Sequence, residues 1–347
     1  MISSNIRYYR LKKGISRSAL ASCCGLSAMA ISNYESRERR PSMEIIKKIA
    51  EALDVKISDL LMQRNENLIF QHSEFRKQQA LTKTEQCYVT ESVEEYFNRL
   101  FTAVDILGGD LIPSIDGCHS LDLSDDDNEN GLAMRSFFNL PEAGPIGKLS
   151  DILENKGFLV FSFDIKNERF SGLNGFVSGH PYIAFNCNMS PECNRSTISH
   201  ELAHILFRWP SCMDDKEKEE RATAIGCAFL FPESDVKREL GMHRSAISKD
   251  MEIICAEYGI STMLLAKRAG IYGIIPKQCL KSFFIEASRR GWRRNEPSRV
   301  PYKEEPLFFK QLVLRAVSEH EISIQKGAEL LHFSYEAVKN SCFYDVE

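Results

Sequence analysis

The sequence predicts a multidomain protein that is mainly α-helical with an α+β centre. The 347 residues exceed the roughly 100 to 200 residues of one typical domain. Apolar residues follow helical spacing towards both ends of the chain, whereas short apolar runs of strand type occur between about residues 158 and 186. We therefore expect a helical head at 1–65, a helical linker with an acidic loop at 66–140, an α+β domain at 141–240 and a helical C-terminal domain at 241–347.

Composition excludes some classes of protein. The chain is 43% hydrophobic and 27% charged, and it lacks an apolar run of the roughly 20 residues that span a bilayer. Its N-terminus does not have the basic-then-apolar pattern of a signal peptide. A cytoplasmic protein without a membrane partner is expected. The eleven cysteines, an odd number, are expected to be reduced and mostly buried, and the spacing of Cys187 and Cys193 matches no standard metal-ligand pair.

Charge is distributed unevenly along the chain. Residues 1–60 carry 11 Lys and Arg against 6 Asp and Glu, a local charge of +5 within a total of −4, which leaves −9 for the rest. A basic head on an acidic body fits a small nucleic-acid-binding module joined to another domain.

The head shows the pattern of several short helices. A second helix should begin at about Ser16, Ser27 is a predicted N-cap of the third, and Gly14 and Gly25 end the first and second helices. Four or five short helices with a glycine between the second and third follow the helix-turn-helix plan. This stretch resembles the xenobiotic-response-element (XRE) type of repressor-like helix-turn-helix domain, for which five helices are expected.

That resemblance implies that the third helix enters the major groove of a double-stranded DNA operator. The side chains that would face bases are Ala28, Met29, Ser32 and Asn33. Those placed to meet phosphates are Arg17, Arg37, Arg39 and Arg40. Arg10 and Glu35 match a structural ion pair of the family. The alternative is a helical dimerisation or docking module without DNA, which the basic charge disfavours.

The linker contains two helical patterns and an acidic stretch. Residues 75–86 begin a polar helical region, and 92–109 place apolar residues at helical spacing. The stretch 122–131 is acidic and rich in turn residues, which favours an exposed loop. It matches the first half of a calcium-binding loop, but Phe137 stands where the bidentate glutamate is required.

The α+β domain is predicted from a change in periodicity. A helix should end at Gly157, a strand should occupy 158–165, and a hairpin 170–186 should complete a small antiparallel sheet. If the strand 180–186 lay at an edge, it could add an extended peptide as a further strand. His180 or Tyr182 could then assist an oxyanion, although ordinary structural roles are favoured.

The next helix contains the pattern H-E-x-x-H at His200, Glu201 and His204. Residues four apart on a helix share one face, so both imidazoles can bind one Zn²⁺. Glu201 would lie beside the metal, where a carboxylate can take a proton from a zinc-bound water. The pattern needs a third ligand, and spacing leaves Glu217, Glu219 and Glu220 on the following helix open.

Residues from about 140 to 240 resemble the ImmA/IrrE family of zinc metallopeptidases, whose helices read R-F-T-L-A-H-E-L-G-H and E-x-x-A-x-x-F-A-x-A-F-L-x-P. Arg195 to His204, and Glu219 to Pro232, stand at the matching positions. The resemblance implies a zincin-like fold with Glu219 as third ligand and Glu220 as the substitute. The departures are at packing positions and are Ser196, Ser199, Ala203, Ile225 and Gly226.

The C-terminal region resembles the helical portion of long members of that family that also carry an XRE head, including the run from Ala287 to Trp292. The stretch 322–339 repeats a helix-turn-helix layout, but a packing or dimerisation role is favoured. Because repressor-like heads commonly act as dimers, a homodimer is expected.

Two functional hypotheses follow. In the first, the head binds an operator and the zinc site cleaves a partner repressor or antitoxin in a DNA-damage, stress or mobile-element response, as the resemblance implies. In the second, the chain is a non-catalytic XRE-type regulator or antitoxin whose peptidase-like domain senses metal or docks a partner. Glu201 favours the first, because a docking domain does not need a general base. Cleavage of the chain's own segment 64–90 is a third, weaker hypothesis.

Overall fold

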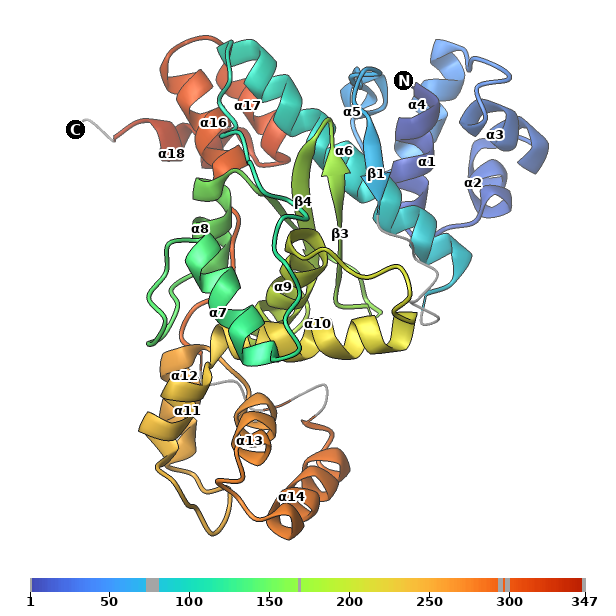
Figure 1. The fold of residues 1–347 in the computed structure, drawn as a ribbon. Coiled ribbons are helices and arrows are strands. Elements are labelled where there is room, and N and C mark those ends of the chain that lie inside the picture. The colour runs from blue at the N-terminus through green and yellow to red at the C-terminus, as the bar shows by residue number, and fades with distance from the viewer. Residues whose placement is uncertain (1, 73–80, 168–169, 293–295, 297–299, 345–347) are drawn as a thin grey trace. The chain divides into compact units, whose positions relative to one another are not determined.

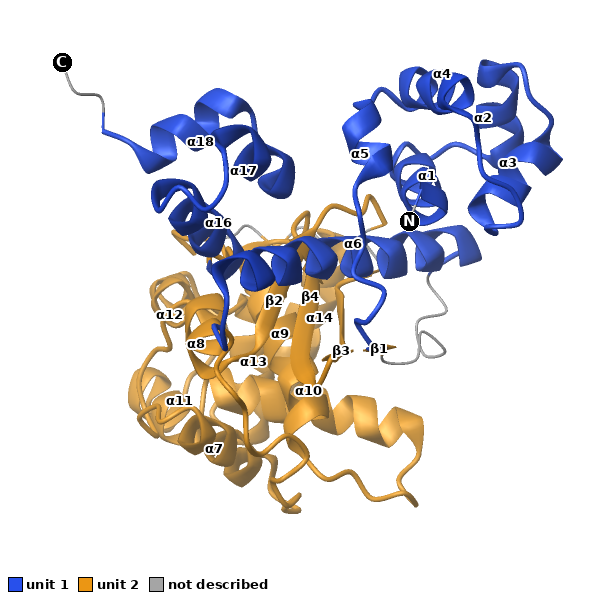
Figure 2. Ribbon diagram, turned by 90° about the horizontal axis from the view of Figure 1, so that it is seen from above, with its two compact units in different colours: residues 1–70, 78–111, 308–347 blue, residues 71–77, 112–307 orange. Residues whose placement is uncertain are grey.

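The computed structural model describes residues 2–72, 81–167, 170–292, 296 and 300–344 (Figure 1). They form two compact units, which are treated separately below (Figure 2). Unit 1 contains residues 1–70, 78–111 and 308–347, and unit 2 contains residues 71–77 and 112–307. Unit 1 is therefore assembled from separate parts of the chain, which a division into four consecutive segments does not anticipate.

The head of unit 1 forms the five expected helices. These are α1 (Ile2–Lys12), α2 (Arg17–Cys24), α3 (Ala28–Glu35), α4 (Met43–Leu53) and α5 (Ile57–Leu61). The hydroxyls of Ser16 and Ser27 accept hydrogen bonds from the first turns of α2 and α3, which confirms the N-cap predicted at Ser27. Gly25 ends α2 in the left-handed conformation, with φ of 67°. A compact apolar core that includes Ile6, Leu20 and Ile31 holds the helices together.

A long helix and the C-terminal helices complete unit 1. The long helix α6 (Lys83–Leu107) confirms the apolar periodicity of 92–109 and begins with a capping box between Thr82 and Glu85. The start of the polar helical region, 75–80, lies outside the described residues. Helices α16 (Phe308–Ser318), α17 (Ile324–Leu331) and α18 (Tyr335–Cys342) follow at the C-terminus, and α6 packs against both α1 and α16.

Helices α17 and α18 reproduce the backbone geometry of α2 and α3. His332 follows α17 with φ 56° and ψ 35°, close to φ 67° and ψ 34° at Gly25. Ser334, like Ser27, lies two residues further and caps the second helix by accepting from its third N–H at 3.1 Å. The helix-turn-helix layout seen in the sequence is thus present in the fold. Its packing against α6 also fits the structural role that was favoured.

A buried ionic group anchors this C-terminal motif inside unit 1. Glu95 accepts two hydrogen bonds from Arg99, at 2.7 and 2.9 Å, and lies 3.3 Å from the ring of His332. Arg99 also donates to the carbonyl of Leu330. Because Glu95 and Arg99 are both buried, each requires the other for charge compensation.

Unit 2 is built on a four-stranded sheet with the order β1-β3-β4-β2. The strands are β1 (Phe70–His72), β2 (Leu159–Phe163), β3 (Gly172–Val177) and β4 (His180–Asn186). Strands β3 and β4 form the predicted hairpin, whereas β2 pairs with β4 in parallel, so the sheet is mixed rather than antiparallel. The expectation that 180–186 is an edge is wrong, because β4 lies between β3 and β2.

The acidic stretch is only partly a loop. Helix α7 (Asp127–Phe137) begins inside it, with the carboxylate of Asp126 accepting from the N–H of Asn128 at 2.8 Å. Acidic residues favour a helix start because they satisfy free N–H groups and complement the helix dipole. The exposed-loop expectation is therefore wrong from residue 127 onwards.

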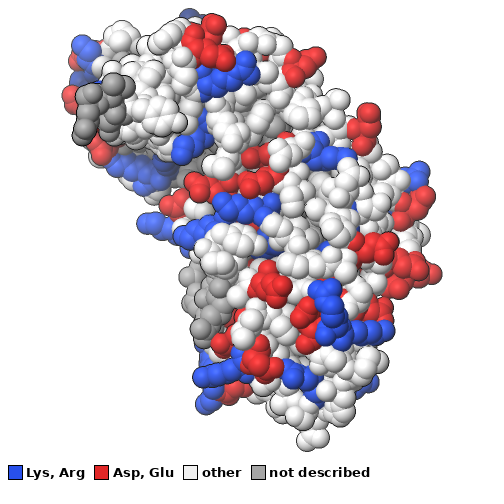
Figure 3. Space-filling model, turned by 90° about the vertical axis from the view of Figure 1, so that its left-hand side faces the viewer, with Lys and Arg blue, Asp and Glu red and all other residues white. Residues whose placement is uncertain are grey.

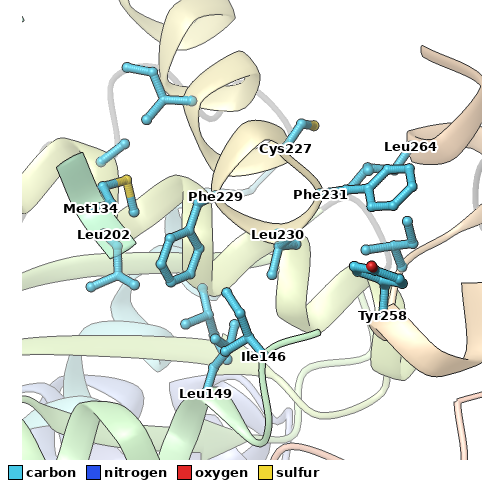
Figure 4. Close-up of a cluster of buried hydrophobic side chains, with 14 of the residues drawn as sticks. Met134, Ile146, Leu149, Leu202, Cys227, Phe229, Leu230, Phe231, Tyr258 and Leu264 are labelled. Atoms are coloured by element: carbon cyan, nitrogen blue, oxygen red, sulfur yellow. The ribbon is translucent and has the colours of Figure 1, made fainter. Parts of the chain in front are cut away.

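Two helices carry the candidate site, and helices on either side pack around them. Helix α8 (Leu149–Lys156) ends at Gly157 as predicted, and α9 (Pro191–Leu206) and α10 (Asp215–Leu230) pack closely. Figure 4 shows Phe229 near Met134 and Leu202, and Phe231 near Tyr258 and Leu264. The apolar core thus fixes α10 from both sides.

The remaining helices of unit 2 follow in order. They are α11 (Glu233–Leu240), α12 (Met251–Tyr258), α13 (Thr262–Ile271) and α14 (Lys277–Arg289). In the described part of the chain, no helix is both long and apolar enough to cross a membrane. All eleven cysteines are free thiols, but three are buried, five are half-buried and three are exposed, so they are less buried than expected.

Candidate metal centre

Three side chains from two helices converge in unit 2. His200 and His204 project from the same face of α9, and Glu219 reaches them from α10. The Nε2 atoms of the two histidines are 3.1 Å apart. The carboxylate oxygens of Glu219 lie 3.2 Å from Nε2 of His200 and 3.4 Å from Nε2 of His204.

These separations fit a tetrahedral ion. Zinc binds histidine nitrogen and carboxylate oxygen at about 2.0 to 2.2 Å, so neighbouring ligand atoms around it should be about 3.3 to 3.6 Å apart. The three observed distances of 3.1 to 3.4 Å lie at or just below that range. Two imidazoles and one carboxylate also leave a fourth position open, as in catalytic zinc sites.

Thr223 sets the protonation of His200. The Thr223 hydroxyl donates to the carbonyl of Glu219 at 2.9 Å, and its oxygen lies 3.1 Å from Nδ1 of His200. Since that hydroxyl proton is already used, Nδ1–H of His200 is the donor in the second contact. With Nδ1 used in this way, Nε2 is the ring nitrogen that faces His204 and Glu219 and is available to a metal ion.

Asn174 fixes the carboxylate of Glu201. Glu201 is buried on α9, and one of its oxygens accepts a 2.6 Å hydrogen bond from the side-chain amide of Asn174 on β3. The sheet thus orients the candidate base beside the two histidines. Sequence analysis did not single out Asn174, because the hairpin register that places it opposite α9 is not visible in the motif.

The ligands interact electrostatically even without an ion. Burial lowers the pKa of His200, but its hydrogen bond to Glu219 and the charges of Glu201 and Glu219 outweigh burial, so the pKa is raised. Hydrogen bonds from His200 and His204 hold the pKa of Glu219 well below its usual range, against the opposing effect of burial. Glu219 is therefore an ionised ligand, and a bound metal ion would take the place of the hydrogen bonds that Glu219 accepts from the two histidines.

The two other candidate carboxylates are not in this group. Glu220 is 70% exposed and lies 3.9 Å from Lys216, and the group of possible metal ligands contains Glu219 rather than Glu217. Of the three carboxylates that spacing left open, Glu219 is the one that the structure brings next to both histidines.

Comparison with family models adds independent information. The model described as the IrrE N-terminal-like domain, of the peptidase family M78, matches residues 153–269. A helix-turn-helix model matches residues 6–60. The chain is a helix-turn-helix domain joined to an IrrE N-terminal-like domain. A comparison with curated proteins found no match.

Two departures from the family pattern in this IrrE-like domain compensate each other. A Cβ placed on Gly226 would lie 3.0 Å from the hydroxyl of Ser199, which is closer than ordinary contact. The family pattern has alanine at both positions, whereas this chain has serine on α9 and glycine on α10. The lost methyl on α10 makes room for the added hydroxyl on α9.

Arg195, the first residue of the family motif, is structural. Its fully buried guanidinium pairs with Glu304 at 2.7 Å and donates to the carbonyls of Ile146 and Gly259. Glu304 in turn accepts from the backbone N–H of Ser150 at the start of α8. This network holds α9 against its neighbours, so that the metal ligands project from a rigid helix.

An aromatic ring borders the site at the end of α9. The ring of Trp209 lies 5.6 Å from that of His204, and its N–H donates to the carbonyl of Ala203 at 3.3 Å. Lys218 on α10 lies over the indole at 5.4 Å. Neither residue was identified from the sequence, where Trp209 lies just beyond the H-E-x-x-H helix.

His180 and Tyr182 are positioned by β4. Tyr182 is fully buried, and its hydroxyl lies 2.5 Å from Nδ1 of His72 on β1. That contact gives Tyr182 a structural partner. An oxyanion role for either residue receives no geometric support.

The helix-turn-helix domain presents most of the expected DNA-facing side chains. Ala28 and Met29 are exposed at the start of α3, Ser32 and Asn33 are half-buried further along, and Arg37, Arg39 and Arg40 are exposed after it. Arg10 and Glu35 form the expected ion pair, with a second hydrogen bond of 3.0 Å. Arg17 also pairs with Glu35 at 2.7 Å, so it is not a free cation.

The residues after position 60 carry charges of both signs with a net charge of −9. On the face drawn in Figure 3, acidic and basic side chains are interspersed. The basic excess is thus a property of residues 1–60, which include the helix-turn-helix domain.

Proposed function

We propose that this protein is a DNA-binding regulator whose IrrE-like domain is a zinc-dependent endopeptidase that cleaves a partner repressor or antitoxin. The observation that carries the proposal is the placement of His200, His204 and Glu219 at tetrahedral ligand distances, with Glu201 buried beside them. A general base at this position has a chemical purpose only if water is activated there.

Each side chain of the site has a separate role in the proposed hydrolysis. His200, His204 and Glu219 would hold Zn²⁺, which supplies a Lewis acid that polarises the scissile carbonyl and acidifies water. Glu201 takes the proton from the attacking water and delivers it to the leaving amine. Asn174 keeps the carboxylate of Glu201 directed towards the reacting atoms by its 2.6 Å hydrogen bond.

The DNA-binding part of the proposal rests on the exposed start of α3 and on the three arginines after it. The side chains at positions 28, 29, 32 and 33 would contact bases, and Arg37, Arg39 and Arg40 would contact phosphates. As a homodimer, the protein would read two half-sites about 34 Å apart. Replacing Arg39 and Arg40 by Ala should weaken binding to all sequences and reduce its salt dependence, whereas Ser32→Ala should alter sequence preference.

The second candidate function is a regulator whose peptidase-like domain only senses metal or docks a partner. Glu201→Gln distinguishes the two functions, because the amide keeps the hydrogen-bonding shape but is not a base. Wild type and Glu201→Gln should bind equal zinc by elemental analysis, and His204→Ala should lose it.

Proteolysis is then measured by adding wild type or variant to a lysate of the cells that normally produce this protein and labelling the new N-termini. Cleavage of a repressor or antitoxin by the wild type alone supports the proposal. Equal zinc binding with identical N-termini in both samples would leave the metal-sensing or docking function.

A further inference from the structure

The outer edge of β3 lies beside the candidate base. Asn174 on β3 bonds to Glu201, and a Cβ at Gly172, two residues earlier, would overlap Thr197 on the same helix. The face of β3 that carries these residues therefore packs on α9. An extended peptide that pairs with the outer edge of β3 would run past Glu201, which is how strand addition aligns a peptide.

That edge is already paired. Strand β1, with Gln71 and His72 in unit 2, occupies the edge of β3 opposite β4. The approach is close, because a Cβ at Gly175 would overlap the carbonyl oxygen of Gln71. Any larger residue at position 175 would push β1 away from the sheet.

A side-chain contact holds β1 in place from the other face. Tyr182 is the cross-strand partner of Gly175, and its side chain passes over that glycine to reach His72 at 2.5 Å. Side chains alternate along a strand, so Gln71 points to the opposite face, the one that Asn174 shares with α9. Gln71 is exposed, so no apolar burial of its side chain holds β1 on the sheet.

We propose that the outer edge of β3 is the peptide-docking edge of the metal centre and that β1 is its internal occupant, which a substrate must displace. This inference rests on the proposed peptidase function, since it gives the regulation of the same site. An attached strand competes at an effective concentration in the millimolar range, so a short pairing of Gln71 and His72 with β3 is enough to suppress binding of a free peptide.

The test uses the full-length chain in a Glu201→Gln background, so that nothing is cut. The probe is a fluorescent peptide with the sequence of residues 63–72, QRNENLIFQH, and binding is read by anisotropy. His72→Ala removes the contact from the internal strand, while the probe keeps its own histidine for Tyr182. His243→Ala is the matched control, because His243 is exposed in the same unit.

We expect His72→Ala to bind the probe about fivefold more tightly than wild type, the effect of one lost hydrogen bond, and His243→Ala to match wild type. The variant His72→Ala with Tyr182→Phe should lose this advantage, because the probe then has no hydroxyl to contact. Equal affinity in wild type and His72→Ala would overturn the proposal. Rapid hydrogen exchange of both the Gln71 and the His72 amide in the wild type would also overturn it, because an edge strand that pairs with β3 protects one of two successive amides.

With Glu201 intact, His72→Ala should also cleave a quenched fluorescent casein faster than wild type. A Glu201-dependent cut in the chain's own residues 63–72 would overturn the proposal, because β1 would then be a substrate rather than an occupant. Failure of the proposed peptidase function is recognised separately, because neither wild type nor His72→Ala would then cut casein. The peptide affinities would still decide whether β1 covers the outer edge of β3.

Discussion

The side-chain amide of Asn174 donates a 2.6 Å hydrogen bond to Glu201, and so joins the sheet to the helix that carries both histidines. Glu201 is buried, and a buried carboxylate that lacks a donor is costly. The same bond limits the orientations of the carboxylate before a substrate binds. Asn174 is therefore a positioning residue.

Asn174→Ala should lower kcat about 10- to 100-fold, because the base loses its orientation, while KM and zinc content stay close to wild type. Asn188→Ala is the control, since Asn188 bonds to Asp164 in a loop after β4. Steady-state kinetics on a cleaved peptide provide the measurement. A change in KM alone would assign Asn174 to substrate contact instead.

Glu219→Gln should weaken zinc binding by at least about 10-fold, because a neutral amide replaces the ionised ligand. Glu220→Gln provides a matched control on the same helix, with its side chain paired to Lys216 instead. Competition with a chromophoric chelator measures the zinc dissociation constant of each variant. Weaker binding in the Glu220 variant and normal binding in the Glu219 variant would contradict the assigned ligand.

The Glu95–Arg99 pair should make unit 1 sensitive to acid. Burial alone would raise the pKa of Glu95, but Arg99 and the hydrogen bond from His332 hold it well below its ordinary value of 4.5. The folded state thus binds this proton less readily than the unfolded state. The stabilisation is complete above about pH 4.5 and is lost as the pH falls through the lower, folded value.

Glu95→Gln should therefore destabilise unit 1 by about 3 kcal/mol at pH 7, because Arg99 stays buried without a counter-ion, and by less below pH 4. Hydrogen exchange of α6 and α17 reads this change. Both tryptophans, Trp209 and Trp292, lie in unit 2, so the fluorescence-detected unfolding of that unit is an internal control. An equal effect at both pH values would show that ionisation is not its source.

Gly226→Ala should destabilise unit 2 by about 1 to 3 kcal/mol, because the new methyl meets the Ser199 hydroxyl at 3.0 Å. Adding Ser199→Ala should recover part of the loss, since it restores the pair of alanines found in the family pattern. Urea unfolding, followed by tryptophan fluorescence, measures the free energy of unfolding of wild type, the two single variants and the double variant. Strict additivity of the two changes would mean that these residues do not interact.

The sequence could predict what local rules determine. Serine caps and Gly25 located the helix-turn-helix elements, and the four-residue spacing of His200 and His204 placed both imidazoles on one face. The resemblance chose Glu219, which spacing alone left open. These features depend on positions a few residues apart or on a motif that is continuous in the chain.

The remaining features depend on contacts between distant residues. The parallel pairing of β2 with β4 and the addition of β1 to β3 join segments that no periodicity connects, so β4 was wrongly expected at an edge. Asn174 and Thr223 were missed for a similar reason, because each is defined by the partner that it meets in space. The start of α7 was missed because its acidic residues suit both a loop and a helix N-terminus.

The discontinuous makeup of unit 1 has a practical consequence for dissecting the protein. The chain leaves unit 1 after residue 111, at the end of α6, and re-enters it at residue 308, at the start of α16. Helices α6 and α16 are in contact within unit 1. Most of unit 2, residues 112–307, is thus an insertion between two segments of unit 1. A truncated chain that ends at residue 307 would keep every residue of unit 2 but would remove α16 to α18 from unit 1, which would expose the buried side chains of Glu95 and Arg99. Deleting residues 112–307 and joining residues 111 and 308 by a short linker would instead keep α6 and α16 to α18 together in unit 1.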